Sequence, residues 1–415
     1  MVGLNRIRCI FAIHLTCIML NPIFCRRRFL SASGLGLLTF AVLTGCVRPA
    51  SQSGSAKDYL LYIGTNVASE QENTVFLYRV SPTTGVFTRV SAMHGGASPT
   101  YLTLAPNRRF LYAVSETQTF RGAASGGVST FAVDPHTGDL RLLNQQPSNG
   151  ASPCYISLDH TNKVALVANY FGGNVSLLPI GSDGQLGTPT TNQQEGHGPH
   201  KNQTGPRAHC LIPDPANKFA FAVNLGTDRV YAYRLNAAAG QLTPLPEPAF
   251  VTKPGAGPRH LVFHPNGKLA YLINELNSTV TALAYDAANG RFRELQTVSA
   301  LPASYTGENS CADIHVAPNG LFLYASNRGH NSIAVFAIDT STGTLVPIQD
   351  VDTQGKTPRN FTLDPSGRLL LVANQGSNNV VSFRVDPQSG LLAPTGQSTE
   401  VPTPLFLQVV ADFTK

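Results

Sequence analysis

The chain has 415 residues, of which 42% are hydrophobic, and this is enough apolar content for one large domain or two ordinary ones. Its formal net charge of +6 is misleading: the first 46 residues hold five of the 30 basic residues and no acidic one, which leaves 25 basic against 24 acidic. That near-neutral remainder excludes the overall basic surface expected of a nucleic-acid-binding protein.

Residues 1–46 are expected to form an export signal. The motif Arg26-Arg27-Arg28-Phe29 resembles the twin-arginine signal, and the apolar run 35–43 has the length of a signal h-region but is too short to span a membrane. The run ends in Leu43-Thr44-Gly45-Cys46, which resembles a bacterial lipobox with Cys46 as the lipidated residue. We expect an exported lipoprotein, periplasmic or at the cell envelope, that meets the membrane through its lipid anchor only. An ordinary secretory signal with an incidental Cys is the alternative.

Residues 47–57 are rich in Ser, Gln and Gly and are expected to be a flexible tether. Residues 58–415 then repeat one pattern seven times: a Pro, a strand, a turn resembling Pro-Asn-Gly, and an apolar strand that ends in a small or amide residue. The copies of that apolar strand are 61–66, 110–116, 164–170, 219–225, 269–275, 322–328 and 369–375. Each continues into two further short strands, and four short strands in about fifty residues are typical of a propeller blade.

The sequence therefore predicts an all-β, seven-bladed β-propeller. The first copy lacks an innermost strand before Tyr59, whereas the chain end, 404–412, has one strand to spare. We expect these N- and C-terminal strands to pair within one blade and close the ring, which would remove the exposed strand edges. An open solenoid or a sandwich is the alternative.

Polar residues are predicted to gather at one end of this propeller. Strands alternate in direction within a blade, so the start of each first strand and the end of each second strand share a face. Aligning the first strands places Arg207, Arg259 and Arg359 in one column, and strand alternation predicts that His209 shares a face with Arg207. The second-strand ends add further polar side chains, namely Glu116, Tyr170, Glu275, Arg328 and Gln375.

This combination suits an anionic substrate that carries an ester carbonyl. Arginine binds carboxylate or phosphate in a bidentate manner and can stabilise a developing oxyanion, while Glu or His can activate water. A column of Asn residues that includes Asn274 precedes the second-strand ends, and a turn-forming role is the simpler interpretation for it. Any single strand-end Arg could equally be a solvated charge.

The histidines are candidate metal ligands, and the cysteines are candidate disulfide partners. His197 and His200 lie in a Gly-rich loop and could join His209 around a metal, but we expect no cofactor, with a divalent metal left open. His264 and His315 lie deeper along their strands and are expected to be packed or surface residues. The cysteines that follow the predicted export signal are odd in number and widely spaced, which favours buried small side chains over a disulfide framework: Cys154, Cys210 and Cys311.

At these residues the chain resembles the propeller-type lactonase family, which includes bacterial 6-phosphogluconolactonase and fungal carboxymuconate lactonizing enzyme. The resemblance runs from about Tyr59 to Val410, and its matching segments are 257–261, 274–280, 326–333 and 358–361. It implies lactone ring opening without an obligatory metal. Many relatives carry His-x-His where this chain has Arg207-Ala208-His209, which puts the role of the first His in doubt here.

The resemblance and the residues together predict a lactone hydrolase that opens a sugar or related lactone by water attack. The expected catalytic residues are Glu275, His209, Arg259 and Arg328. The expected substrate-binding residues are Arg207, Arg359, His260, Asn274, Tyr170 and His330. We expect a monomer whose partner is a small anionic lactone, and an exported enzyme would more readily meet an unphosphorylated one. The alternatives are a non-catalytic ligand- or protein-binding propeller at the cell envelope and a redox or metal propeller.

Overall fold

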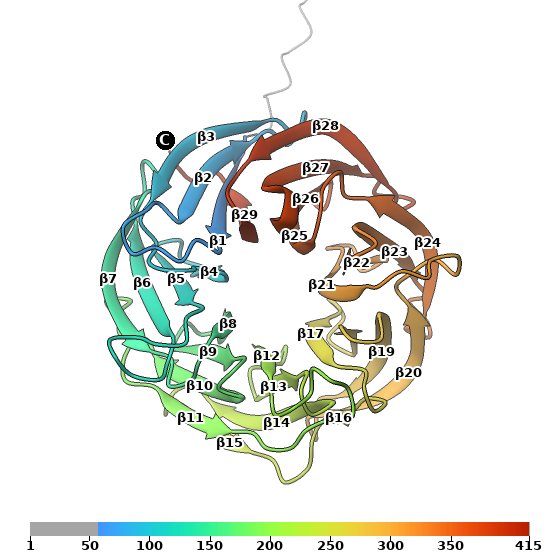
Figure 1. Ribbon diagram of the computed structural model, residues 1–415, viewed down its shortest axis with the longest axis horizontal. Helices are drawn as coiled ribbons and strands as arrows, with labels where there is room; N and C mark the ends of the chain where they lie inside the picture. Colours follow the sequence, from blue (N-terminus) through green and yellow to red (C-terminus); the bar gives the residue numbers. More distant parts are fainter. Residues whose placement is uncertain (1–56, 415) are drawn as a thin grey trace, which may run out of the picture. The chain divides into compact units, whose positions relative to one another are not determined.

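The computed structural model describes residues 57–414 and is all-β, with seven sheets arranged in a ring around a central axis (Figure 1). The predicted export signal, Cys46 and all but the last residue of the predicted tether lie outside the described residues. In chain order the blades are β29-β1-β2-β3, β4–β7, β8–β11, β12–β16, β17–β20, β21–β24 and β25–β28, called blades 1 to 7 below. The seven-bladed propeller expected from the repeats is confirmed.

Each blade contributes an innermost strand at the axis and a fully buried second strand. The innermost strands are β29 (Pro404–Ala411), β4 (Leu102–Leu104), β8 (Pro153–Leu158), β12 (Ala208–Pro213), β17 (Pro258–Phe263), β21 (Ser310–Val316) and β25 (Pro358–Leu363). The second strands are β1 (Tyr59–Thr65), β5 (Phe110–Ser115), β9 (Val164–Asn169), β13 (Phe219–Asn224), β18 (Leu269–Asn274), β22 (Phe322–Arg328) and β26 (Leu369–Asn374). A short 3₁₀ turn, η1 (Gln375–Ser377), follows β26.

The outer two strands of each blade are increasingly exposed. The third strands are β2 (Val75–Val80), β6 (Gly127–Val133), β10 (Asn174–Pro179), β14 (Arg229–Asn236), β19 (Thr279–Asp286), β23 (Ser332–Ile338) and β27 (Asn379–Val385). The outermost are β3 (Phe87–Met93), β7 (Leu140–Pro147), β11 (Thr190–Gln193), β15 (Gln241–Pro244) with β16 (Phe250–Val251), β20 (Arg291–Ser299), β24 (Leu345–Asp352) and β28 (Leu392–Glu400).

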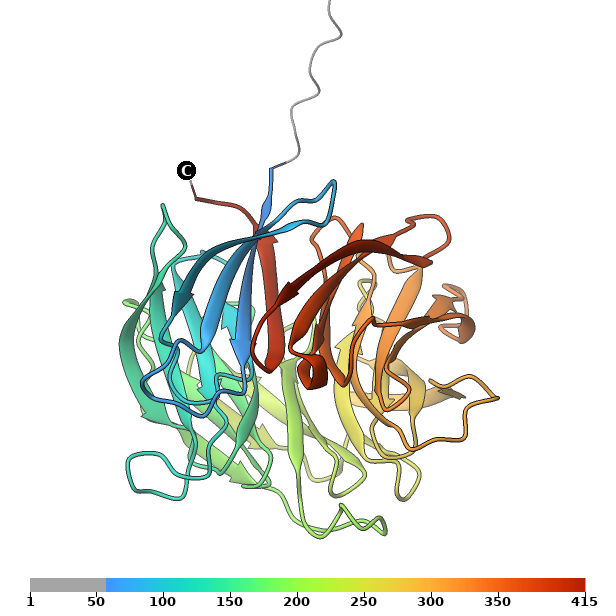
Figure 2. The same ribbon diagram turned by 45° about the horizontal axis from the view of Figure 1, so that its top comes forward.

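The two chain ends close the ring. Strand β29 pairs antiparallel with β1, with Leu60 opposite Val410 and Ile63 opposite Leu407, and the two strands lie side by side in blade 1 (Figure 2). The predicted closure by the terminal strands is therefore confirmed. Apolar side chains pack between neighbouring blades, as where Phe221 of blade 4 and Leu272 of blade 5 share one cluster.

A repeated hydrogen bond ties each of four blades to the next. A buried Tyr of the second strand donates its hydroxyl to the carbonyl of the glycine in the outer turn of the following blade. The four pairs are Tyr62–Gly138, Tyr112–Gly184, Tyr271–Gly343 and Tyr324–Gly390, with O···O distances of 2.8, 3.0, 3.2 and 2.9 Å. The Tyr ring fills the interface between the blades while its only polar atom is satisfied.

A β-bulge recurs at the start of the innermost strand. In blade 5, Pro258 pairs with Asn274 and His260 with Ile273, so Arg259 is the extra residue. The same shift makes Arg359 the extra residue of blade 7 and His209 that of blade 4. Such bulges re-aim side chains beside functional sites. The predicted column of arginines is therefore wrong in one member, because His209 and not Arg207 occupies the position of Arg259 and Arg359.

Candidate active site

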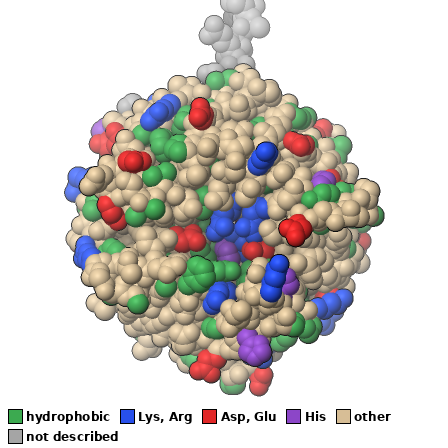
Figure 3. Space-filling model, in the orientation of Figure 1, with side chains coloured by type: hydrophobic (Ala, Val, Ile, Leu, Met, Phe, Trp, Pro, Cys, Tyr) green, Lys and Arg blue, Asp and Glu red, His purple; other side chains and the backbone are tan. Residues whose placement is uncertain are grey.

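The bulges lie at the end of the ring where the innermost strands begin and the second strands end, called the mouth below. Seen along the axis, this face is hollowed at its centre, and basic, acidic and histidine side chains gather in the hollow (Figure 3). The most enclosed charges come from the bulge of blade 5 and from the residues that follow β18 and end β22. The mouth thus brings buried charges from neighbouring blades together at the axis.

Glu275 holds two arginines on one carboxylate oxygen. Its Oε2 lies 3.0 Å from Nε of Arg259 and 2.9 Å from Nη2 of Arg328. The side chain of Arg259 is 2% exposed, so this ion pair is shielded from solvent. Arg328 also donates to the carbonyl of Cys311 at 3.0 Å, which fixes its guanidinium against β21. Among the described residues, ion pairs engage only Oε2 of Glu275, so Oε1 remains available to a ligand or water.

The arginines determine the charge state of this cluster. Burial alone would raise the pKa of Glu275, but Arg328, Arg259 and Arg359 outweigh it and hold that pKa below its ordinary value. Burial, followed by repulsion from Arg328 and Arg359, lowers the pKa of Arg259 to about 10, against the opposing pull of Glu275. Near neutral pH the carboxylate is therefore ionised and both arginines carry their charge.

A second ion pair, between Arg359 and Glu116, lies across the mouth. Nη2 of Arg359 lies 3.8 Å from Oε1 of Glu116, and Thr100 donates its hydroxyl to Oε2 of Glu116 at 2.6 Å. These residues and Arg259 line a narrow recess of about 10 Å³, which is room for about one water molecule. This polar recess is therefore too small to hold a lactone.

The larger pocket has a volume of about 500 Å³ and opens over Glu275 and Arg328. Its rim comes from His200 and Lys201 of the loop before β12 and from Glu308 and Asn309 before β21. Gln203, which is 1% exposed, anchors that first loop by donating to the carbonyl of Leu225 and to the carboxylate of Asp228 at 2.8 and 2.7 Å. The volume falls in the range of small-molecule sites, and the walls are polar.

His209 lies within a ring of aromatic contacts. Its ring centroid is 5.5 Å from that of Tyr170 and 5.2 Å from that of His260, and its Nδ1 lies 3.7 Å from the thiol of Cys154. Burial is the main cause that lowers the pKa of His209 well below its ordinary value, followed by the charge of Arg259. The imidazole is therefore neutral at physiological pH and can accept a proton.

Arg207 lies at the rim rather than among the buried charges. Its guanidinium carbon lies 5.9 Å from the ring centroid of Tyr170 and 5.4 Å from that of Phe171, and its Nη1 donates to the carbonyl of Pro206 at 2.8 Å. Because it precedes β12, the bulge that turns His209 inward does not act on it. Arg207 is thus a partly exposed cation stacked on aromatic rings.

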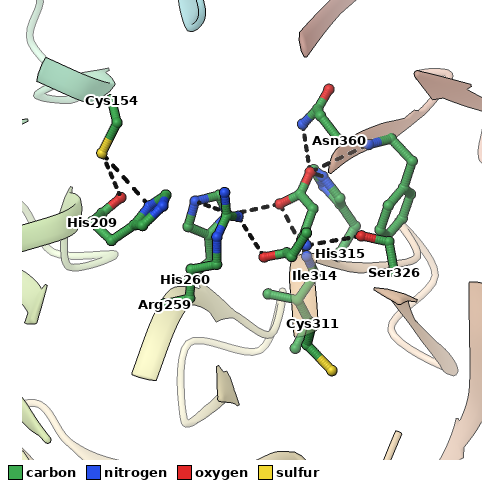
Figure 4. A network of polar contacts seen from close by, with 12 residues as sticks. Cys154, His209, Arg259, His260, Cys311, Ile314, His315, Ser326 and Asn360 are labelled. Atoms are coloured by element: carbon green, nitrogen blue, oxygen red, sulfur yellow. Dashed lines mark hydrogen bonds and ion pairs between the residues drawn. The ribbon is translucent and has the colours of Figure 1, made fainter. Parts of the chain in front are cut away.

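His260 belongs to a buried hydrogen-bond network (Figure 4). Its Nδ1 lies 2.8 Å from Oδ1 of Asp313, and Nη1 of Arg259 lies 3.2 Å from its Nε2. Burial, followed by the charge of Arg259, lowers the pKa of His260 to about 4, although Asp313 opposes the shift. Both ring nitrogens are thus occupied by protein groups. No motif in the sequence marks Asp313 as a functional residue.

Two predicted substrate-binding residues point to local partners instead. Asn274 donates to the hydroxyls of Thr279 and Thr281 at 2.9 and 3.1 Å. It therefore links the end of β18 to the start of β19 in its own blade, as the turn-forming interpretation predicted. His330 has its Nδ1 2.7 Å from the hydroxyl of Ser332 and packs on Tyr305, and it is not among the residues that line the pocket. Both side chains therefore contact protein groups, and their predicted substrate contact stays a prediction.

The other histidines and cysteines contribute packing. Across residues 57–414, no group of three His, Cys, Asp or Glu is arranged to hold a metal ion, and His197 and His200 do not assemble with His209. His264 is buried against the carbonyl of Gly320, as expected for a packed residue. The cysteines of the described region are free and buried, as predicted: Cys154, Cys210 and Cys311. Nor does this region contain a helix long and apolar enough to cross a membrane.

Comparison with known proteins agrees with this geometry. Residues 60–409 match the family model described as lactonase, seven-bladed β-propeller. A 6-phosphogluconolactonase of Bacillus subtilis is 36% identical over 307 residues, covering 74% of this chain and 85% of that protein. A second, from Formosa agariphila, is 35% identical and covers 73% and 86%. The solved structure of a periplasmic gluconolactonase from Pseudomonas aeruginosa has a TM-score of 0.80 and 34% identity, and the match covers 86% of this chain and 99% of that one.

Proposed function

The chain belongs to the seven-bladed β-propeller lactonase family and is a lactone hydrolase, and we propose that it opens an anionic sugar lactone or related lactone by water attack in the mouth. One observation carries the proposal: Glu275 binds Arg259 and Arg328 on a single oxygen, and Glu275 and Arg328 line a pocket of about 500 Å³. Two fixed cations suit both an anionic group and the negative charge that develops on an attacked carbonyl.

In the proposed mechanism the arginines act on oxygen. Arg259 and Arg328 donate to the lactone carbonyl as its oxygen becomes negative, while Arg359 and Arg207 hold anionic or hydroxyl groups further along the substrate. The fixed guanidinium groups need little reorganisation when charge develops, because Ala312 and Cys311 carbonyls already orient them. Tyr170 packs beside His209, and its hydroxyl binds a hydroxyl of the sugar.

A base must remove one proton from the attacking water. Oε1 of Glu275 and the neutral imidazole of His209 are the two acceptors available, and we assign the role to Glu275 because its second oxygen is already fixed by the arginines. Water adds to the carbonyl carbon as its proton passes to the base. The ring carbon–oxygen bond then breaks, and the departing alkoxide takes the proton, which yields the open hydroxy acid.

The N-terminal motifs extend the proposal to the compartment. The twin-arginine-like motif and the lipobox-like Cys46 support an exported lipoprotein, and one solved relative is named as periplasmic. An enzyme outside the cytoplasm would meet unphosphorylated lactones, so we propose a uronic acid lactone or an aromatic-derived lactone that carries a carboxylate, with an uncharged aldonolactone as the related substrate. Cell fractionation of wild-type and Cys46→Ser chains tests this, since loss of the Cys should release the protein from the membrane fraction.

The activity is tested with a panel of sugar and aromatic lactones, phosphorylated and unphosphorylated, in a pH-indicator assay. Acid release above the spontaneous rate identifies the substrate class. A flat panel from folded protein would reject the proposed substrates, and retention of a lactone without product would favour the non-catalytic binding propeller.

A further inference from the structure

Asp313 is a buried carboxylate that the reaction above does not use. It lies in the bulge of β21, where Cys311 pairs with Asn327 and Ile314 with Ala325, and it is 3% exposed. An isolated carboxylate in such a place would be strongly destabilising, so its contacts must compensate its charge.

The contacts of Asp313 join its own blade to both neighbouring blades. Oδ1 accepts hydrogen bonds from Nδ1 of His260 at 2.8 Å and from the backbone N–H of Ile314 at 3.0 Å. Oδ2 accepts from Nε2 of His315 at 3.0 Å and from the amide of Asn360, which itself accepts from the backbone of Leu407. Figure 4 shows these partners converging on one point from different strands. Burial opposes ionisation, but His315 and His260 outweigh it and keep the pKa of Asp313 far below its ordinary value.

The ionised carboxylate fixes the tautomer of His260. Since Oδ1 can only accept, Nδ1 of His260 must carry the hydrogen, which leaves Nε2 as an acceptor. Nη1 of Arg259 lies 3.2 Å from that Nε2 and 2.6 Å from the carbonyl of Ala312. Two contacts of Nη1, with His260 and with the carbonyl of Ala312, and the ion pair of Nε with Glu275 therefore hold the guanidinium in place. No hydrogen bond among the described residues engages its Nη2, which is left for a ligand.

We propose that Asp313 is a positioning residue that acts through His260 to orient the guanidinium of Arg259 toward the lactone carbonyl. The proposal rests on the proposed role of Arg259 and adds two residues that touch no substrate. It gives His260 a positioning role in place of the predicted substrate contact, because Asp313 and Arg259 engage its two ring nitrogens. A misplaced guanidinium would still bind an anion but would stabilise the transition state less.

The first test replaces Asp313 with Asn, which keeps the volume but puts an N–H₂ group against hydrogen-bond donors. We expect kcat for the lactone that the wild type opens to fall on the order of a hundredfold, with KM changed less than about threefold. The matched control is Asp364→Asn, since Asp364 is equally buried and brackets the turn between β25 and β26 at the far end of the blade. A kcat for Asp313→Asn equal to that of the control would overturn the proposal.

The second test uses His260 and does not depend on how well the Asp313 variant folds. Gln can donate to Asp313 and accept from Arg259, whereas Leu can do neither. We expect His260→Gln to recover at least about tenfold in kcat over His260→Leu. Equal activity in the two variants would mean that packing alone explains the position.

A third measurement separates this inference from the proposed function. Imidazole ¹⁵N signals of the wild type should show His260 protonated at Nδ1, and the signal should change in Asp313→Asn but not in Asp364→Asn. An Arg259→Met chain measured in parallel tests the proposed function itself. If Arg259→Met keeps wild-type turnover, the role of Arg259 fails whatever the NMR shows. If it loses turnover while His260 shows the Nε2–H tautomer, the relay alone fails.

Discussion

His209 and Arg259 occupy the same position in neighbouring blades, each as the extra residue of a bulge that starts an innermost strand. This bulge recurs in several blades, and the sequence of each of these blades decides which side chain stands at the extra position. In blade 3 the position holds Cys154, and in blade 7 it holds Arg359. The candidate site is therefore built from one backbone device used with different side chains.

Replacing Glu275 by Gln should abolish most turnover. The change removes both the proposed base and the counter-charge of two arginines, one of them buried, so we expect kcat to fall by at least about a hundredfold. Steady-state kinetics with the panel substrate measure this, with circular dichroism as the check of folding. Glu294→Gln, at an exposed position of β20, is the matched control. A Glu275→Gln rate near that of the control would remove Glu275 from the mechanism.

The rate should be independent of pH from about pH 5 to pH 8 after subtraction of spontaneous hydrolysis. The pKa of Glu275 is held below its ordinary value and that of His209 well below its own, so either base is already deprotonated over this range. Activity should decline only at lower pH, where the base is protonated. A profile that rises through a midpoint near pH 6.5 would instead indicate an ordinary, solvated histidine.

Acid should destabilise the protein through its buried histidines. The pKa of His260 is lowered to about 4 in the fold, so below about pH 6.5 the unfolded chain binds a proton that the folded chain does not. Stability is therefore full above that pH and is lost as the pH falls toward 4. Urea unfolding at pH 7 and pH 5 should differ by about 2 kcal/mol from this residue alone. His260→Gln should reduce the difference, and an unchanged difference would assign it to other groups.

Arg207→Met should affect binding more than chemistry. The side chain lies at the rim over Tyr170 and Phe171, so its loss removes a cation that the substrate meets outside the buried cluster. We expect KM for an anionic lactone to rise severalfold with kcat nearly unchanged, and KM for an uncharged lactone to stay constant. A fall in kcat comparable to that of Glu275→Gln would place Arg207 among the catalytic groups.

Tyr324→Phe should weaken the fold without changing kcat. Its hydroxyl donates to the carbonyl of Gly390 in the next blade at 2.9 Å, and both groups are shielded from water. Leaving that carbonyl unpaired should cost about 1–2 kcal/mol in the free energy of unfolding. Urea denaturation measures the loss, and a kcat shift with unchanged stability would contradict a purely structural role.

The repeats made the architecture predictable, because each blade carries its own turn residues and a largely apolar second strand. The apolar strand predicted at 322–328 matches β22 to the residue, and the spare strand near Pro404 correctly predicted how the ring closes. Glu275, Arg328 and Arg259 could be placed at one mouth for the same reason. These features follow from local pattern and period, which a single sequence contains.

The bulges could not be predicted in the same way. A bulge inserts one residue without changing the apolar pattern that follows. The arginine column failed for a different reason: Arg207 was matched to Arg259 through the Pro that precedes each, although His209 and Arg259 each lie six residues before their turn prolines, Pro215 and Pro265. The role of Asp313 was equally hidden, because its partners His260 and Asn360 are 53 and 47 residues away and belong to other blades. Such contacts join residues about one repeat apart in the sequence, and no local motif encodes them.

The pairing of β29 with β1 also constrains how the protein is made. During synthesis the first strand leaves the ribosome about 350 residues before its partner exists, so blade 1 waits with one edge unpaired until the last strand is complete. A ribosome that stops early would leave six blades and an open edge, a species prone to pair with other chains. Pairing of both edges of blade 1 therefore requires that the final dozen residues have been synthesised.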